Sequence, residues 1–177
     1  HFGQLLDFYN GRRDLQKREV RVLHSLSFID DPTRLLRAVR FEQRLAFTIE
    51  ANTEHLIPAS LPLLAEVSGE RLRHEIELIL AEKNAVLMLA RLDELKILTH
   101  IVTGLHCHPE TAVFFRRLDA LAQQPLWEEV AAEERPFIRL ALWLSPLPPA
   151  MRAQTLQRLV MRRQVEKDVQ LVSALLP

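Results

Sequence analysis

One short segment holds the residues best suited to chemistry: Asp31 and the arginines Arg34, Arg37, Arg40 and Arg44. A helix turns about 100° per residue, so the four arginines fall on one side, within about 120° of each other. Four like charges on one face repel, and the isolated chain gains nothing from the arrangement. It makes sense if an anion, or a planar group with several acceptors, lies along the arginines. The segment is a candidate ligand-binding site.

Asp31 and Arg34 stand one helical turn apart and could together read a nucleobase. The carboxylate would accept from an exocyclic amine, and the guanidinium would donate to a ring nitrogen or carbonyl. The same residues also fit an ordinary helix start, with Asp30 or Asp31 as the cap and Pro32 at the first helical position. An arginine stripe is often only a solvated face. The residues alone leave both interpretations open.

A second basic cluster lies near the C-terminus, where Arg158, Arg162 and Arg163 precede Lys167. Helical spacing would gather these side chains, and contact with an RNA phosphate backbone is one interpretation. A solvated face fits equally well. The four residues are candidate RNA-binding residues.

The sequence predicts no metal site. His100, His106, Cys107 and His108 lie close together, but two histidines separated by one residue are not a structural zinc pattern. No second ligand pair stands at the usual separation. We interpret the group as a loop that happens to carry histidines.

Two tryptophans could stack on RNA bases. Trp143 lies in the apolar run of residues 140–144, and we expect it in the core. Trp127 borders a loop after Pro125, where packing is favoured over stacking.

The composition indicates an all-α fold. There are 33 leucines against 27 valines, isoleucines and threonines combined, and only four glycines. Unbranched side chains lose little rotamer freedom in a helix, whereas β-branched ones favour strands. Helical patterns open at about Pro32 and at Ser68, the latter with Ser68 as the cap. Others are expected at residues 53–57, 84–92, 94–100, 111–123, 128–133, 136–144, 150–161 and 164–176.

Charge and cysteine content limit the function classes. The net charge is zero, which argues against indiscriminate nucleic-acid binding, although residues 12–44 carry nine Lys or Arg against five Asp or Glu. No apolar run approaches the roughly 18 residues of a membrane helix. Cys107 is the only cysteine, so no internal disulfide forms and a cytoplasmic setting fits best.

Three segments in the same order resemble the bacterial CCA-adding enzyme and poly(A) polymerase family. Residues 14–41 match closely, and residues 31–34 look like the family's template for the incoming nucleotide, usually Glu-Asp-x-x-Arg. Asp30 departs from that pattern, since Glu is usual there. Residues 3–7 with Gly11 look like the motif that joins the catalytic head to the neck, and residues 67–75 look like a helix that braces the neck.

The resemblance implies the multi-helical neck and body of a class II tRNA nucleotidyltransferase. Asp31 and Arg34 would select the base of ATP or CTP, and Arg37 and Arg40 would contribute to the nucleotide site. The carboxylates that hold Mg²⁺, and the loop that holds the phosphates, would precede His1 in a catalytic head. The chain starts without Met, and we expect a cut inside a longer protein. We therefore expect no catalytic residue here and no transfer activity from the fragment alone.

The expected organisation has three parts. Residues 1–24 would end the head and connect it, residues 25–103 would form the neck with the template, and residues 104–177 would form a helical body in contact with tRNA. The partners would be the 3′ end of tRNA or another RNA, ATP or CTP, and the head.

Two alternatives stay open. The parent protein could add A, C, the whole CCA or a poly(A) tail, because the template motif is shared. A non-catalytic helical interaction module is the alternative of another class, and internal salt bridges at Asp31 and Arg34 would favour it.

Overall fold

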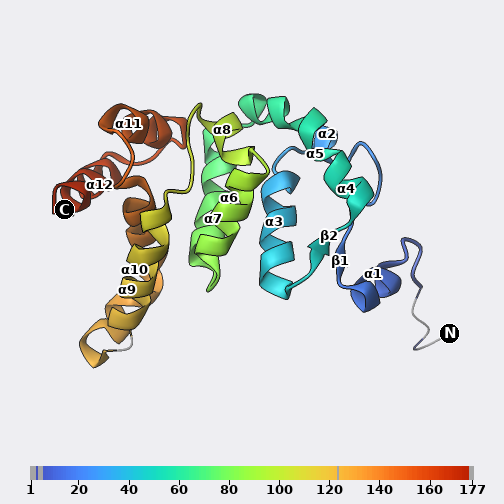
Figure 1. Cartoon of the computed structure of the whole chain (residues 1–177), viewed down its shortest axis with the longest axis horizontal. Helices are drawn as coiled ribbons and strands as arrows, with labels where there is room; N and C mark the ends of the chain where they lie inside the picture. Colours follow the sequence, from blue (N-terminus) through green and yellow to red (C-terminus); the bar gives the residue numbers. More distant parts are fainter. Residues whose placement is uncertain (1–2, 4–5, 123, 176–177) are drawn as a thin grey trace.

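The computed structural model describes residue 3 and residues 6–122 and 124–175. The molecule is elongated, with the N- and C-terminal elements at opposite ends (Figure 1). Its first elements are α1 (Gly11–Lys17), β1 (Glu19–Val20), α2 (Ser27–Asp30), α3 (Arg34–Leu45), β2 (Thr48–Ile49), α4 (Ala51–His55), α5 (Ile57–Ser60) and the 3-10 helix η1 (Leu61–Glu66). Its remaining elements are α6 (Gly69–Ala81), α7 (Ala85–Glu94), α8 (Ile97–Ile101), α9 (Pro109–Leu121), α10 (Pro125–Leu144), α11 (Pro149–Arg158) and α12 (Arg163–Leu175).

The all-α prediction is confirmed, with one small addition. Strands β1 and β2 pair in parallel, with Glu19 opposite Thr48 and Val20 opposite Ile49. Two residues per strand carry no readable alternation, so the sequence could not predict this pairing. It fastens the segment before α2 to the segment after α3.

Helices α3, α6 and α7 lie side by side in the middle of the molecule and provide much of the core (Figure 1). Leu35, Leu36 and Val39 of α3 are completely buried, which leaves the opposite side of that helix for its charged residues. Helix α6 also packs against α10, which in turn packs against α9 and α12. Helix α6 therefore connects α3 with the C-terminal helices.

Helix α10 corrects a prediction. The chain was expected to break before Pro136, giving separate helices at residues 128–133 and 136–144, but α10 is continuous from Pro125 to Leu144. A proline inside a helix removes one backbone hydrogen bond. The residues after Pro136 offset that loss, because Leu140, Trp143 and Leu144 are buried in the core.

The two tryptophans differ in outcome. The core position predicted for Trp143 is confirmed, since the side chain is fully buried and its Nε1 donates to the carbonyl of His106 at 3.1 Å. The side chain of Trp127 lies outside the described residues.

The start of α6 is held tightly against the C-terminal helices. Ser68 caps it as predicted, accepting from the backbone N–H of Arg71 at 3.5 Å. A Cβ on Gly69 would lie 2.4 Å from the carbonyl oxygen of Arg158, so only glycine fits there. Arg73 Nη1 adds a hydrogen bond to the carbonyl of Val160 at 2.6 Å.

Among the described residues, no helix is both long and apolar enough to cross a membrane.

Candidate functional site

Asp31 occupies the turn between α2 and α3. Its Oδ1 accepts from the backbone N–H of Thr33 at 3.1 Å, from the Thr33 hydroxyl at 2.6 Å and from Arg71 Nη2 at 2.8 Å. The bond to the Thr33 N–H closes an Asx turn, so α3 begins at Arg34 and not at Pro32. This corrects the predicted helix start. Within the part of the chain that the structure describes, Oδ2 accepts no hydrogen bond.

Asp31 is ionised at neutral pH. Partial burial by itself would raise the pKa of its carboxyl group, but the hydrogen bonds from Thr33 and the charge of Arg71 outweigh burial and lower the pKa below its usual value. An ionised carboxylate only accepts hydrogen bonds. Its open oxygen therefore suits a donor such as an exocyclic amine.

Arg34 lies at the first position of α3. Its Nη1 donates to the carbonyl of Ser27 at 3.1 Å, which fixes the guanidinium against α2. Its Nε and Nη2 have no partner among the described residues. Asp31 and Arg34 thus each present one anchored and one open polar edge, three residues apart.

The predicted arginine stripe divides in the structure. Arg37 is exposed and forms no ion pair with any described residue. Arg40 is different, because only 12% of its side chain is exposed and its Nη2 lies 3.6 Å from Glu75 Oε2. Arg40 Nη1 and Arg44 Nη1 lie 3.9 and 3.5 Å from Glu82 Oε1. The expectation of one open stripe is corrected here, since Arg40 braces α3 against α6.

Arg71 is the residue at this site that sequence reasoning missed. It stands three positions after the Ser68 cap, where a capping box would carry Glu or Gln. That departure was a usable signal, because an arginine there cannot accept from the cap N–H and is free to reach another element. Its partner, Asp31, is 40 residues earlier in the sequence.

The predicted C-terminal cluster also divides. Arg158 Nη2 donates to the carbonyls of Leu64 and Val67 at 2.9 and 2.8 Å, where it satisfies the end of η1. Arg158 is thereby withdrawn from the predicted basic surface. Arg162, Arg163 and Lys167 are exposed, with no ion-pair partner within the described ranges.

The histidine-rich loop uses its polar atoms locally. The Nδ1 atoms of His100 and His106 lie 2.7 and 2.9 Å from the carbonyls of Lys96 and Gly104, and His108 caps α9. Burial, followed by the nearby Asp93, raises the pKa of Cys107 to about 11, so the thiol stays protonated. In the described part of the chain, no three His, Cys, Asp or Glu side chains gather as metal ligands would.

The sequence of the chain is similar to a family model and to several known proteins. The model described as "Probable RNA and SrmB- binding site of polymerase A" matches residues 46–113. An A-adding tRNA nucleotidyltransferase of Geobacter sulfurreducens is 45% identical over 112 residues, which are 62% of this chain and 13% of that protein. A CCA-adding enzyme of Geobacillus stearothermophilus is 31% identical over 86% of this chain and 37% of its own length.

Solved structures of similar proteins superpose on almost the whole of this chain. The Thermotoga maritima CCA-adding enzyme complexed with tRNA-CCA is 34% identical, with a TM-score of 0.77 over 96% of this chain and 42% of that one. A CCA-adding enzyme with CTP is 35% identical, with a TM-score of 0.79 over 98% of this chain and 42% of that one. The chain therefore spans less than half the length of each of these relatives.

By fold, the chain matches the helical neck and body portions of CCA-adding enzymes. It belongs to the family of tRNA nucleotidyltransferases and bacterial poly(A) polymerases, as the motifs predicted.

Proposed function

We propose that this chain selects the incoming nucleotide and binds RNA in a nucleotidyltransferase that adds A, C or both to tRNA 3′ ends. The observation that carries the proposal is Asp31, whose Oδ1 is fixed while Oδ2 accepts from no described residue, three positions before Arg34, whose Nε and Nη2 also have no described partner. Adenine and cytosine both offer an exocyclic amine to such an acceptor, whereas uracil offers a carbonyl in its place.

The site acts by positioning. A base that hydrogen-bonds with both groups is held in one orientation, and a base with an acceptor opposite Asp31 leaves the carboxylate unsatisfied. Arg37, exposed one turn further along α3, is placed to contact the rest of the nucleotide. Arg40 is mostly buried beside Glu75, and it stays a proposed contributor to the nucleotide site.

The Mg²⁺ of the reaction is assigned to residues outside this chain. Asp30 and Asp31 do not fit a metal pair, because Asp31 is neutralised by Arg71 and Asp30 Oδ2 lies 3.7 Å from His24 Nε2. When bound, the metal ions would stabilise the charge of the transferred group. Residues 1–24 would connect to a catalytic head, and the chain by itself would carry out no transfer.

Residues 25–103 would form the neck and residues 104–177 the body. In the body, Arg162, Arg163 and Lys167 are the proposed contacts to the phosphates of tRNA, while Arg158 holds η1. The setting that fits tRNA processing and a single cysteine is the cytoplasm.

A second candidate, a helical interaction module, is favoured by the ion pair of Asp31 with Arg71. The first candidate is preferred because that pair occupies one carboxylate oxygen only, and because Arg34 bonds to a carbonyl and not to a carboxylate. A parent that makes poly(A) tails would use the same template and differ outside this chain.

The test is binding of a tRNA that lacks its CCA end, at two salt concentrations, to the chain and to an Arg34→Ala, Arg37→Ala variant. We expect micromolar binding that weakens as salt rises, and little change in the variant, because these arginines serve the nucleotide. No binding at low salt would contradict the RNA-binding role. A large loss in the variant would reassign the two arginines to RNA.

A further inference from the structure

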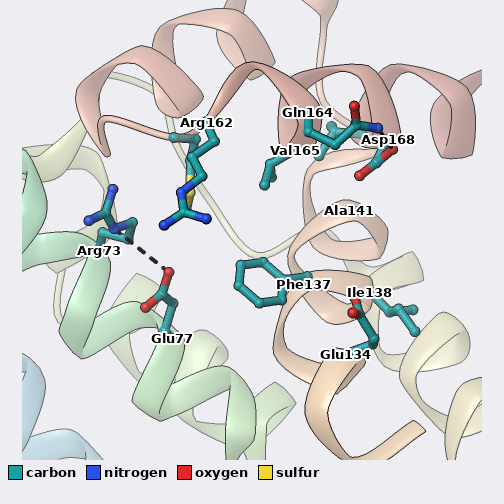
Figure 2. A pocket seen from close by; sticks show the side chains of 12 residues that line it. Arg73, Glu77, Glu134, Phe137, Ile138, Ala141, Arg162, Gln164, Val165 and Asp168 are labelled. Carbon is teal, nitrogen blue, oxygen red and sulfur yellow. Dashed lines mark hydrogen bonds and ion pairs between the residues drawn. The ribbon is translucent and has the colours of Figure 1, made fainter. Parts of the chain in front are cut away.

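A pocket of about 730 Å³ opens between α6, α10 and α12, away from the template site (Figure 2). Helix α10 contributes Glu134, Phe137, Ile138 and Ala141, which recur at the spacing of one helical face. Helices α6 and α12 form the other walls. The volume suits a small ligand or one monomer of a polymer.

The pocket holds a half-exposed aromatic side chain. Phe137 is 41% exposed, although Ala141 one turn later is buried in the core. Its ring lies among the other lining side chains, near the middle of the pocket (Figure 2). Val165 stands across from it. Leaving a phenylalanine half exposed in a hollow costs hydrophobic free energy, which a planar apolar ligand would recover.

Both arginines of the pocket lie at one end. Arg73 and Arg162 are joined there by Glu77, whose Oε1 lies 3.7 Å from Arg73 Nε, while Glu134 and Asp168 lie beyond Phe137 (Figure 2). Arg73 is therefore already paired with Glu77, and its Nη1 also donates to the Val160 carbonyl. Arg162 forms no ion pair with any residue that the structure describes, so its guanidinium is available to an anion.

The acidic end offers acceptors. Asp168 Oδ1 accepts from Gln164 Nε2 at 2.9 Å, and the Glu134 carboxylate is exposed with no partner among the described residues. Carboxylates of this kind accept from the exocyclic amine of a base. They repel a phosphate, which favours a position beside Arg162, the pocket arginine that pairs with no described carboxylate.

We propose that this pocket binds one unpaired nucleotide of the bound RNA, an inference that rests on the proposed function. The base stacks on Phe137, its amino edge faces Glu134, and its phosphate lies at Arg162. Single-stranded bases are commonly recognised in this way, by stacking and edge contacts together. Arg163 and Lys167, exposed at the same end of α12, continue the phosphate path.

The first test uses nucleoside monophosphates, followed through the backbone amides of α10 and α12 by NMR. We expect CMP to shift these amides and UMP to bind roughly tenfold more weakly, because UMP lacks the amine. Phe137→Leu keeps an apolar side chain but removes the stacking face, and should weaken CMP binding roughly tenfold. Arg162→Ala should do the same, while Arg117→Ala, an exposed arginine on α9, serves as the matched control.

The second test uses the tRNA that lacks CCA, with the same variants. Weaker tRNA binding by Phe137→Leu and Arg162→Ala, with no change in Arg117→Ala, supports the pocket. Unchanged binding by both pocket variants overturns it and leaves the proposed function intact. If the wild-type chain binds no tRNA, the proposed function fails, and CMP shifts in α10 and α12 then decide the pocket alone.

Discussion

Asp31 shows how one side chain can be held and still remain available. Thr33 and Arg71 take the same oxygen, which fixes the carboxylate without using its second acceptor. The Asp31 carboxylate is held in one orientation before any base binds. Binding a base would therefore cost little further side-chain entropy. Arg71 is therefore a positioning residue for Asp31.

The lowered pKa of Asp31 leads to a pH prediction. Its folded pKa lies below its unfolded pKa, so ionisation of Asp31 stabilises the fold above the unfolded value, and that contribution is lost as pH falls through the folded value. We expect the free energy of unfolding to drop as pH falls below about 4, and the Arg71→Ala variant to drop less steeply over that range. Urea unfolding from pH 2 to pH 6 measures both slopes.

The matched control for that measurement is Arg37→Ala, which removes an exposed arginine of the same region that pairs with no described residue. Identical slopes in wild type and Arg71→Ala would show that Arg71 does not control the ionisation of Asp31.

At the scale of elements, the start of α6 is closely packed against the end of α11. Its position is set by contacts with residues far away in sequence, the carbonyl of Arg158 against Gly69 and the carbonyl of Val160 under Arg73. The opposite end is held by the buried Arg139, whose Nη1 donates to the carbonyls of Leu80 and Glu82 at 2.8 and 2.6 Å. Helix α6 is thus fixed at both ends.

Gly69→Ala tests the first of these contacts. The added methyl would lie 2.4 Å from a backbone oxygen, so the helix or the turn after α11 must shift. We expect a loss of about 1–3 kcal/mol in the free energy of unfolding, as overpacking costs elsewhere. Thermal or urea unfolding measures it. Gly11→Ala is the control, because its methyl would meet only Asp7 Oδ1 at 3.7 Å, and a loss there as large as at Gly69 would contradict the account.

The same scale shows what sequence could and could not predict. The helical fold, the Ser68 cap and the buried Trp143 follow from local composition, capping and apolar runs, and the sequence predicted all three. The structural roles of Arg158 and Arg40 could not be predicted, because the residues they contact are far away in the sequence. The partners of Arg158 are 91 to 94 residues away. The sequence alone does not distinguish an arginine that bonds to distant backbone carbonyls from an exposed arginine that could bind RNA.

At the scale of the whole molecule, α6 connects the two proposed binding surfaces. Its α3-facing side carries Arg71, which holds Asp31, and another side carries Arg73 and Glu77, which line the pocket beside α10 and α12. The chain is extended, so a long RNA could contact the template region and the C-terminal helices together (Figure 1).

The divided C-terminal cluster predicts two different phenotypes. Replacing Arg162, Arg163 and Lys167 with alanine should weaken tRNA binding and reduce the slope of log K against log salt by about 2, with unfolding unchanged. Arg158→Ala should lower the free energy of unfolding by about 1–3 kcal/mol, because three carbonyls at the end of η1 lose their donor. Filter binding over a salt series and urea unfolding separate the effects. The reverse pattern would restore Arg158 to the RNA surface.

The most direct measurement of the central claim is nucleotide selectivity at Asp31 and Arg34. Saturation-transfer NMR of the chain with ATP, CTP and UTP in turn would compare their binding, with Asp31→Ala as the variant and Asp30→Ala as the matched neighbour. We predict signals for ATP and CTP, a much weaker signal for UTP, and loss of the preference in Asp31→Ala only. Equal binding of all three nucleotides, or an unchanged preference in Asp31→Ala, would contradict the assignment of a protein template to this site.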